Sequence, residues 1–298
     1  MIEVLILSML GLAGSALGGA VADDDVDNSF DGEDRDDPLP RDTSLLMPEG
    51  AGEPVVVAQD TGNVAPADTL SEDAQYGSGA DDLLTDWHGD VELYGGGGDD
   101  KLQGGFDGDR LSVFYGGDGD DTIRDGDNAA LIYGGDGDDR ITSGHGQSEI
   151  DGGAGDDVID AGIQTDTVYG GAGNDRLVSV GSGDSDDPDL LYGGVGDDDL
   201  HAYGTAKLYG GAGADRFTTY ANTWVEHAPV IADFNPAVDT LCVEIDSHEG
   251  MQELSDFQVE VQDFADGTGA SVFVDGYEVM RVPGGQGIRL EDVELKLV

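Results

Sequence analysis

Aspartates in this sequence recur at a fixed distance behind pairs of glycines, a spacing that suits the binding of a cation. The pattern Gly-Gly-x-Gly-x-Asp-x-(apolar) is complete at 95–102. It recurs at 116–123, 134–141, 152–159, 170–177, 193–200 and 210–217, with weaker copies at 104–111 and from Gly77 onward. The central copies begin 18 residues apart, twice nine, so the chain is first of all a repeat array.

The residue types at these positions match the chemistry of Ca²⁺. This hard cation takes about six to eight oxygen ligands in flexible geometry. Glycine permits the φ > 0 conformations that turn carbonyl oxygens inward, and the aspartate adds carboxylate oxygens. One turn offers too few ligands, but two turns stacked at a strand spacing of about 4.8 Å can share one ion.

We therefore expect calcium ligands at the sixth-position aspartates and at the first glycine of each turn. The aspartates are Asp100, Asp121, Asp139, Asp157, Asp175, Asp198 and Asp215, with Asp109 added from the weaker copy. The glycines are Gly95, Gly116, Gly134, Gly152, Gly170, Gly193 and Gly210. A ladder of n turns holds about n − 1 ions, so we expect about six Ca²⁺, and up to eight with the weaker copies.

The residues on either side of each sixth-position aspartate are expected to play a lesser part. Fifth-position residues should lie behind the ligands or on the surface: Asp99, Asp120, Asp138, Asp156, Asn174 and Asp197. Seventh-position bases should ease carboxylate repulsion from exposed positions: Lys101, Arg110, Arg140, Arg176 and Arg216. Exposed ion pairs of this kind contribute little individually.

Two apolar columns accompany the turns and predict the elements that position them. One stands two residues before each glycine pair: Leu93, Phe114, Ile132, Ile150, Val168, Leu191 and Leu208. The other stands two residues after each aspartate: Leu102, Ile123, Ile141, Ile159, Leu177, Leu200 and Phe217. This pattern is expected of two short strands that face each other across a thin core. The intervening half-repeats keep a glycine but have mostly lost the aspartate, so one flank should be rich in ligands and the other poor.

The charge balance excludes one class of partner. The chain has 12 Lys and Arg against 65 Asp and Glu, a formal net charge of −53. A protein that binds nucleic acid or an anionic membrane surface needs a basic face, so neither partner is expected. So acidic a chain is either disordered or neutralised by bound cations, and the ordered glycines favour the second reading.

The remaining chemistry-bearing residues form no catalytic motif. The five histidines lack H-E-x-x-H spacing, and there is no G-x-S-x-G elbow or Gly-Lys-Ser/Thr phosphate loop. Asp-x-Asp runs lack the spaced glutamate of an EF-hand. The single cysteine, Cys242, stands in an apolar run, which predicts a buried side chain and excludes an intramolecular disulfide. We expect no enzyme activity.

The chain before the repeats divides in two. Residues 1–22 are apolar apart from Glu3 and end in Ala20-Val21-Ala22, which predicts an export signal; an uncleaved membrane anchor and a buried core helix are the alternatives. Residues 23–74 are acidic and rich in proline and small residues, so we expect a disordered linker.

The repeat region, 75–218, is followed by ordinary β patterning over 219–298. Alternation over 271–282 with a turn at Asp275-Gly276 predicts a hairpin, and 293–298 predicts a last strand. A stack of coils needs its open end covered, so this region is expected to be a β cap.

The in-register copies resemble the RTX, or haemolysin-type calcium-binding repeat, family, whose signature is this nonapeptide. The segment 230–241, Val-Ile-Ala-Asp-Phe-Asn-Pro-Ala-Val-Asp-Thr-Leu, looks like the region that closes the β-roll in that family. The resemblance implies an all-β parallel β-roll, a right-handed β-solenoid, and a C-terminal secretion signal within 219–298 read by a type I exporter. It also implies an extracellular destination, although the apolar N-terminus departs from the pattern.

These inferences predict a noncatalytic, secreted calcium-binding protein that folds on binding Ca²⁺ outside the cell. One alternative is a cell-surface adhesin or membrane-anchored matrix protein held through 1–22. The other is a secreted toxin or enzyme with an active site in the last 80 or so residues.

Overall fold

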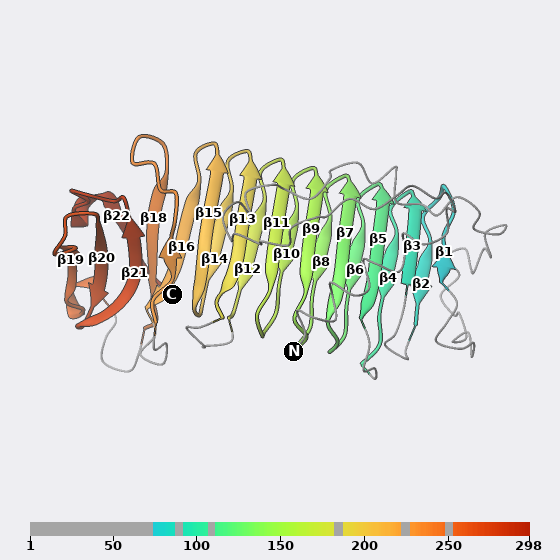
Figure 1. The fold of residues 1–298 in the computed structure, drawn as a ribbon, viewed down its shortest axis with the longest axis horizontal. Helices are drawn as coiled ribbons and strands as arrows, with labels where there is room; N and C mark the ends of the chain where they lie inside the picture. The colour runs from blue at the N-terminus through green and yellow to red at the C-terminus, as the bar shows by residue number, and fades with distance from the viewer. Residues whose placement is uncertain (1–73, 87–91, 107–110, 182–186, 222–226, 248–252) are drawn as a thin grey trace, which may run out of the picture. The chain divides into compact units, whose positions relative to one another are not determined.

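Two parallel β-sheets make up the repeat region of the computed structural model, which describes residues 74–86, 92–106, 111–181, 187–221, 227–247 and 253–298. All of these lie in the unit Arg41–Val298. Successive strands alternate between the two sheets, so each repeat contributes one strand to each sheet (Figure 1). This arrangement confirms the predicted parallel β-roll architecture.

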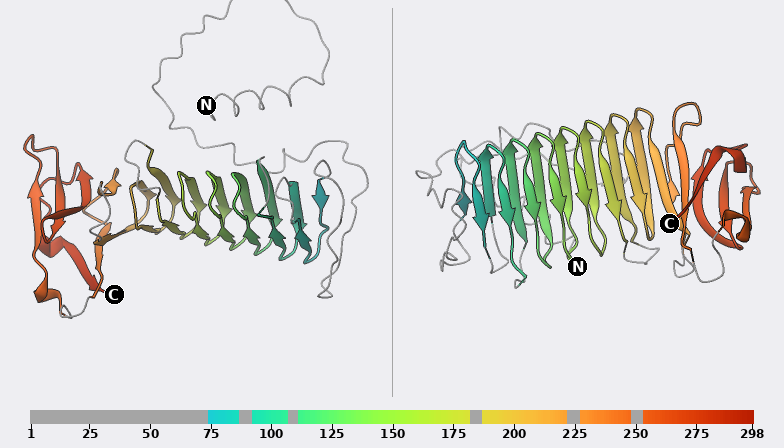
Figure 2. Two further views of the ribbon diagram at one scale, coloured as in Figure 1. Left: turned by 90° about the horizontal axis from the view of Figure 1, so that it is seen from below. Right: turned by 180° about the vertical axis from the view of Figure 1, so that it is seen from behind.

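The strands preceding the glycine turns form the first sheet. They are β1 (Gln75–Tyr76), β3 (Glu92–Gly97), β5 (Ser112–Asp118), β7 (Ala130–Asp136), β9 (Glu149–Ala154), β11 (Thr167–Ala172), β13 (Asp189–Val195) and β15 (Ala206–Ala212). The strands following those turns form the second sheet. They are β2 (Leu83–Thr85), β4 (Lys101–Gln103), β6 (Thr122–Arg124), β8 (Arg140–Thr142), β10 (Val158–Asp160), β12 (Arg176–Ser179), β14 (Asp199–Ala202) and β16 (Arg216–Ala221). Figure 2 shows the same succession of coils from two further sides.

Both predicted apolar columns face inward. Every member of the two columns, from Leu93 to Leu208 and from Leu102 to Phe217, is 0–1% exposed. The register stacks each residue on its counterpart one repeat away, as in Ile132 on Ile150 and Ile141 on Ile159. The core is therefore a continuous apolar seam one side chain deep from each sheet, and no coil has a core without its neighbours.

A row of tyrosines runs along the first sheet. Tyr76, Tyr94, Tyr115 and Tyr133 stack with ring centroids 4.8 Å apart. A second stack comprises Tyr169, Tyr192 and Tyr209, at 4.7–5.0 Å. Asp151 occupies the position between the two stacks, because it pairs in register with Tyr133 on one side and Tyr169 on the other.

The C-terminal part extends both sheets and then turns antiparallel. β17 (Val230–Ile231) and β18 (Thr240–Ile245) pair in parallel with β15 and β16. β21 (Tyr277–Pro283) follows β17, and β22 (Val293–Leu297) follows β18, again in parallel. β19 (Val259–Asp263) and β20 (Gly269–Val274) complete the first sheet as antiparallel strands. Two short 3-10 helices, η2 (Leu254–Asp256) and η3 (Leu290–Asp292), lie in the connections.

Two local predictions for this region are confirmed. β20 and β21 form the expected hairpin, and both turn residues have positive φ, 50° at Asp275 and 84° at Gly276, as a two-residue turn requires. β22 is the expected last strand. Cys242 is fully buried, and burial raises the pKa of its thiol, so it behaves as a small core residue.

The predicted signal segment 1–22 and the predicted linker 23–74 lie outside the described residues, apart from the last position of the linker. Within the part of the chain that the structure describes, no helix combines the length and apolar character of a membrane span.

Candidate functional site

Seven predicted ligands, Asp100, Asp121, Asp139, Asp157, Asp175, Asp198 and Asp215, form one column along a flank of the roll. Each stands directly before a strand of the second sheet, and the strand pairing stacks the turns in register. All seven are only 1–2% exposed. Asp109, the eighth predicted aspartate, lies outside the described residues.

One carboxylate oxygen of each aspartate is used to join neighbouring coils. The backbone N–H of Asp100 donates to Oδ1 of Asp121 at 2.7 Å, and the N–H of Asp121 donates to Oδ1 of Asp139 at 2.7 Å. The series continues through Asp157, Asp175, Asp198 and Asp215 at 2.8–3.0 Å. Each side chain therefore holds the backbone of the preceding coil and has its own orientation fixed by it.

The other carboxylate oxygen has no partner. Oδ2 is buried and makes no hydrogen bond in Asp100, Asp121, Asp139, Asp157, Asp175 and Asp198. A buried ionised oxygen without a partner costs several kcal/mol of desolvation. The same unpartnered oxygen occurs in six aspartates, so it is a property of the repeat. A bound cation would offset this cost of desolvation.

The predicted glycines complete the surroundings of Oδ2. A Cβ built on Gly134 would overlap both Oδ2 of Asp139 in its own turn and the carbonyl oxygen of Gly152 in the next coil. The same two kinds of oxygen face Gly95, Gly116, Gly152, Gly170 and Gly193. Each first glycine thus leaves open a small space between a carboxylate oxygen and a carbonyl oxygen of the adjacent turn, which we call the cradle.

The second and fourth residues of each turn adopt conformations that favour glycine. In the turn of Asp157, for example, φ is 109° at Gly153 and 135° at Gly155. Side chains are strained at such φ values, so the Gly-x-Gly spacing is a backbone requirement. These turns bring carbonyl oxygens to the flank where the unpartnered Oδ2 atoms lie.

Electrostatics also favours a cation at this flank. Burial raises the pKa of Asp100 and Asp175 to about 6, of Asp121, Asp139 and Asp198 to about 7, and of Asp157 to about 8. The inter-coil hydrogen bond offsets part of this rise in pKa, and neighbouring carboxylates add to it. Without a cation, the folded ladder therefore resists ionisation near neutral pH.

The oxygen-only donor set fits Ca²⁺. In the described residues no three Asp, Glu, His or Cys side chains converge on one point. Each cradle instead combines carboxylate and backbone carbonyl oxygens from two stacked turns, the mixed oxygen set that calcium accepts and that soft transition metals do not select. The residues that would hold the ion are the sixth-position aspartate of one turn and the first glycine of the next.

The fifth-position residues form a second, exposed ladder. The N–H of Asp138 donates to Oδ1 of Asp120 at 2.9 Å, and the N–H of Asp156 donates to Oδ1 of Asp138 at 2.8 Å. Asp99, Asn174 and Asp197 continue it in both directions. These residues lie at the surface, as the sequence predicted, but they also connect the coils.

Two more aspartates extend the ladder, a buried one (Asp82) at its first coil and a half-buried one (Asp239) at its last. At the first coil, Asp82 Oδ2 accepts bonds from Ser78 N and Oγ at 2.6 and 2.8 Å, so hydrogen bonds satisfy this oxygen. At the last, Asp239 accepts from Asp215 N at 3.1 Å, and the Asp233 carboxylate accepts from Gly210 N and Gly211 N at 3.0 Å. The sequence carried a signal for both, because Asp82 and Asp239 each stand two residues before a buried leucine.

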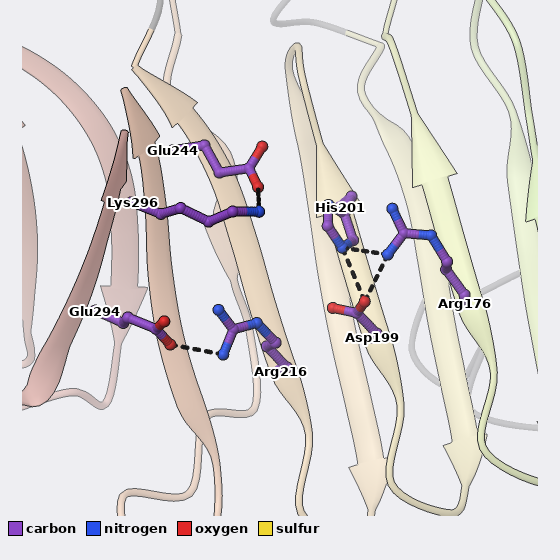
Figure 3. Close-up of polar contacts among 7 residues, drawn as sticks. All are labelled: Arg176, Asp199, His201, Arg216, Glu244, Glu294 and Lys296. Carbon is purple, nitrogen blue, oxygen red and sulfur yellow. Dashed lines mark hydrogen bonds and ion pairs between the residues drawn. The ribbon is translucent and has the colours of Figure 1, made fainter. Parts of the chain in front are cut away.

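Two of the seventh-position bases, Arg176 and Arg216, pair with acids on their own sheet. Figure 3 shows Arg176 beside Asp199, with 2.6 Å between Nη1 and Oδ2, and Arg216 beside Glu294, at 2.8 Å. His201 joins the first pair, and Lys296 contacts Glu244 at 2.6 Å. Arg176 and Arg216 therefore bind acids on the surface of the second sheet instead of the ladder aspartates. Arg110 lies outside the described residues.

Comparison with known families identifies the repeats. The RTX calcium-binding nonapeptide repeat matches the chain in four copies, at residues 76–111, 115–148, 146–177 and 184–205. None of the curated proteins compared matches the chain.

Proposed function

Because this chain carries RTX calcium-binding nonapeptide repeats, with the aspartate ladders typical of the calcium sites of a β-roll, we propose that it is a secreted, noncatalytic protein that folds on binding Ca²⁺ outside the cell. RTX repeat proteins are typically secreted. The observation that carries the proposal is the row of buried, unpartnered Oδ2 atoms beside glycine carbonyls.

The negative charge of the chain explains why calcium would favour the folded state. With a net charge of −53 and a core one side chain deep, the calcium-free roll is opposed by repulsion along its own ladder. Ions that bind the folded state and not the unfolded chain add stability by mass action. Extracellular calcium modules work at about 10⁻⁴–10⁻³ M Ca²⁺, far above cytosolic levels, so the chain would stay unfolded inside the cell and fold outside.

The number of ions proposed is six. Six successive cradles pair an unpartnered Oδ2 with the first-glycine carbonyl of the next coil, from Asp100 with Gly116 to Asp198 with Gly210. The Asp82 turn is left out because Ser78 already satisfies its Oδ2. We also propose that a type I exporter carries the chain out, through a signal within 219–298.

Circular dichroism of the purified chain at pH 7.5, with excess EGTA and then with 5 mM CaCl₂, tests the folding switch. We expect a strand signal that forms only with calcium and returns to coil on chelation. MgCl₂ at the same concentration is the control for ionic strength, because Mg²⁺ demands a tighter octahedral site. An equal strand signal in EGTA and in calcium would contradict the proposal.

A surface-anchored adhesin or matrix protein is the second candidate. The apolar run 1–22, followed directly by Asp23-Asp24-Asp25, favours it if the run stays uncleaved. Intact-mass measurement of the exported protein separates the two, since removal of 22 residues supports free secretion and a full-length, detergent-extractable chain supports anchoring.

A further inference from the structure

The roll has a second flank, whose turns run from the second sheet back to the first. We number each of these turns as the ladder turns are numbered. Position 1 stands two residues after one buried apolar residue, and position 6 stands two residues before the next buried apolar residue. In one such turn these positions are Ala161 and Asp166, which follow Ile159 and precede Val168. They correspond to Gly152 and Asp157 of the ladder flank.

The turn 161–166 keeps three features of the ladder turns. Asp166 is fully buried, and its Oδ1 accepts a bond from the N–H of Ser148, one coil earlier, at 2.7 Å. Its Oδ2 is buried with no hydrogen-bond partner. φ is positive at the second and fourth residues, 77° at Gly162 and 88° at Gln164, as in the ladder turns.

Position 1 is the difference. In every cradle of the ladder flank, a Cβ at this position would overlap the aspartate Oδ2 and the carbonyl oxygen of the next coil. Ala161 carries that Cβ, so its methyl group takes the place that the cradle leaves open. An ion held between Asp166 Oδ2 and the carbonyl of the next position-1 residue, Ser179, would meet this methyl group.

In the two turns next to 161–166, a side-chain hydrogen bond links position 1 to position 6 of the same turn. Ser179 Oγ donates to Oδ2 of Asp189, whose Oδ1 accepts from the N–H of Asp166 at 3.0 Å. Ser143 Oγ and Ser148 Oγ lie 2.8 Å apart and share a hydrogen bond. Hydroxyl groups here satisfy the oxygens that a cation would otherwise satisfy.

We propose that the turn 161–166 is a latent calcium turn which the Ala161 methyl group closes. The proposal rests on calcium binding by the ladder flank. It assigns Ala161 as the residue that limits calcium to one side of the roll at this coil.

Equilibrium dialysis against ⁴⁵Ca²⁺ at saturating calcium tests this by counting ions per chain. We expect Ala161→Gly to bind one ion more than the parent chain, and the double variant Ala161→Gly/Asp166→Asn to return to the parent number. Ala154→Gly, which adds the same flexibility at an exposed turn position of the ladder flank, should leave the number unchanged.

A second comparison tests the proposal with variants that are not expected to gain a calcium ion. Asp166→Asn alone should leave the ion count at the parent value, whereas Asp157→Asn should lower it. If Asp166→Asn removes an ion, the turn is already open and the proposal is wrong. An unchanged count in a folded Ala161→Gly variant also overturns it, and a parent chain that binds no calcium would instead overturn the proposed function.

Discussion

The backbone N–H of Asp139 donates to Oδ1 of Asp157, one coil further on, at 2.8 Å. This bond fixes the Asp157 side chain so that its Oδ2 faces the cradle beside Gly152 and the Gly170 carbonyl. The structural and ligand roles of the aspartate are therefore divided between its two oxygens. An asparagine in place of this aspartate can keep the inter-coil hydrogen bond but loses the negatively charged ligand oxygen.

Asp157→Asn should weaken calcium binding without removing the inter-coil hydrogen bond. The amide oxygen still accepts from Asp139 N, but the cradle loses a negative charge and an oxygen. We expect the chain to bind at least one ion fewer and to need roughly tenfold more calcium at the folding midpoint, equivalent to about 1.4 kcal/mol. Calcium titration followed by circular dichroism measures this midpoint.

The matched control is Asp156→Asn, one residue earlier. Asp156 is exposed, and its Oδ1 accepts from Asn174 N at 2.7 Å, a bond that an amide oxygen also accepts. Its midpoint should move less than about twofold, since an exposed charge contributes little. Equal shifts in the two variants would show that net charge, and not the cradle, governs folding.

Gly152→Ala should close a cradle in the way that Ala161 closes its turn. The added methyl group would overlap Asp157 Oδ2 and the Gly170 carbonyl oxygen, so the ion between these turns is lost. We expect one ion fewer by dialysis and a loss of about 1–3 kcal/mol in calcium-bound stability. Gly79→Ala is the control, because a Cβ at Gly79 meets nothing within 4 Å. An unchanged ion count for Gly152→Ala would refute the cradle.

The period of the sequence was enough to predict the two sheets, the two apolar columns and the ladder. It was enough because apolar residues nine apart indicate two strands that face one core, and glycines at fixed offsets indicate turns with positive φ. Asp82 and Asp239 were missed because their turns have lost glycines, although the leucines two residues later mark them. The closed turn at Ala161 could not be predicted from the sequence. The effect of its methyl group can be recognised only when the positions of the cradle oxygens are known.

Acid should partly replace calcium. The pKa of Asp121, Asp139 and Asp198 in the calcium-free roll is about 7, and that of Asp157 about 8, against 3.8 for an ordinary aspartate. A carboxyl group with a raised folded-state pKa binds protons preferentially when folded, so it stabilises the roll at low pH. This contribution is complete below about pH 4 and is lost as the pH rises toward about 8.

Circular dichroism in EGTA from pH 8 to pH 4 checks the acid effect. We expect strand signal to increase as the pH falls, and the calcium midpoint measured in parallel to rise, because protons and Ca²⁺ compete for the same oxygens. The signal in saturating calcium at pH 7.5 sets the reference for full folding. A calcium-free chain that gains no structure on acidification would show that repulsion within the ladder is not what keeps it unfolded.

Asp151 interrupts the tyrosine row, and filling the gap should stabilise the calcium-bound roll. Asp151→Tyr places a ring between Tyr133 and Tyr169, its register partners, and creates two new stacked pairs. Each aromatic pair contributes about 0.5–1.5 kcal/mol, so two pairs should raise the free energy of unfolding, measured with urea in 5 mM Ca²⁺, by about 1–3 kcal/mol. Asp151→Asn separates this effect from the loss of a negative charge. If the asparagine variant gains as much as the tyrosine variant, charge relief and not stacking explains the change at this position.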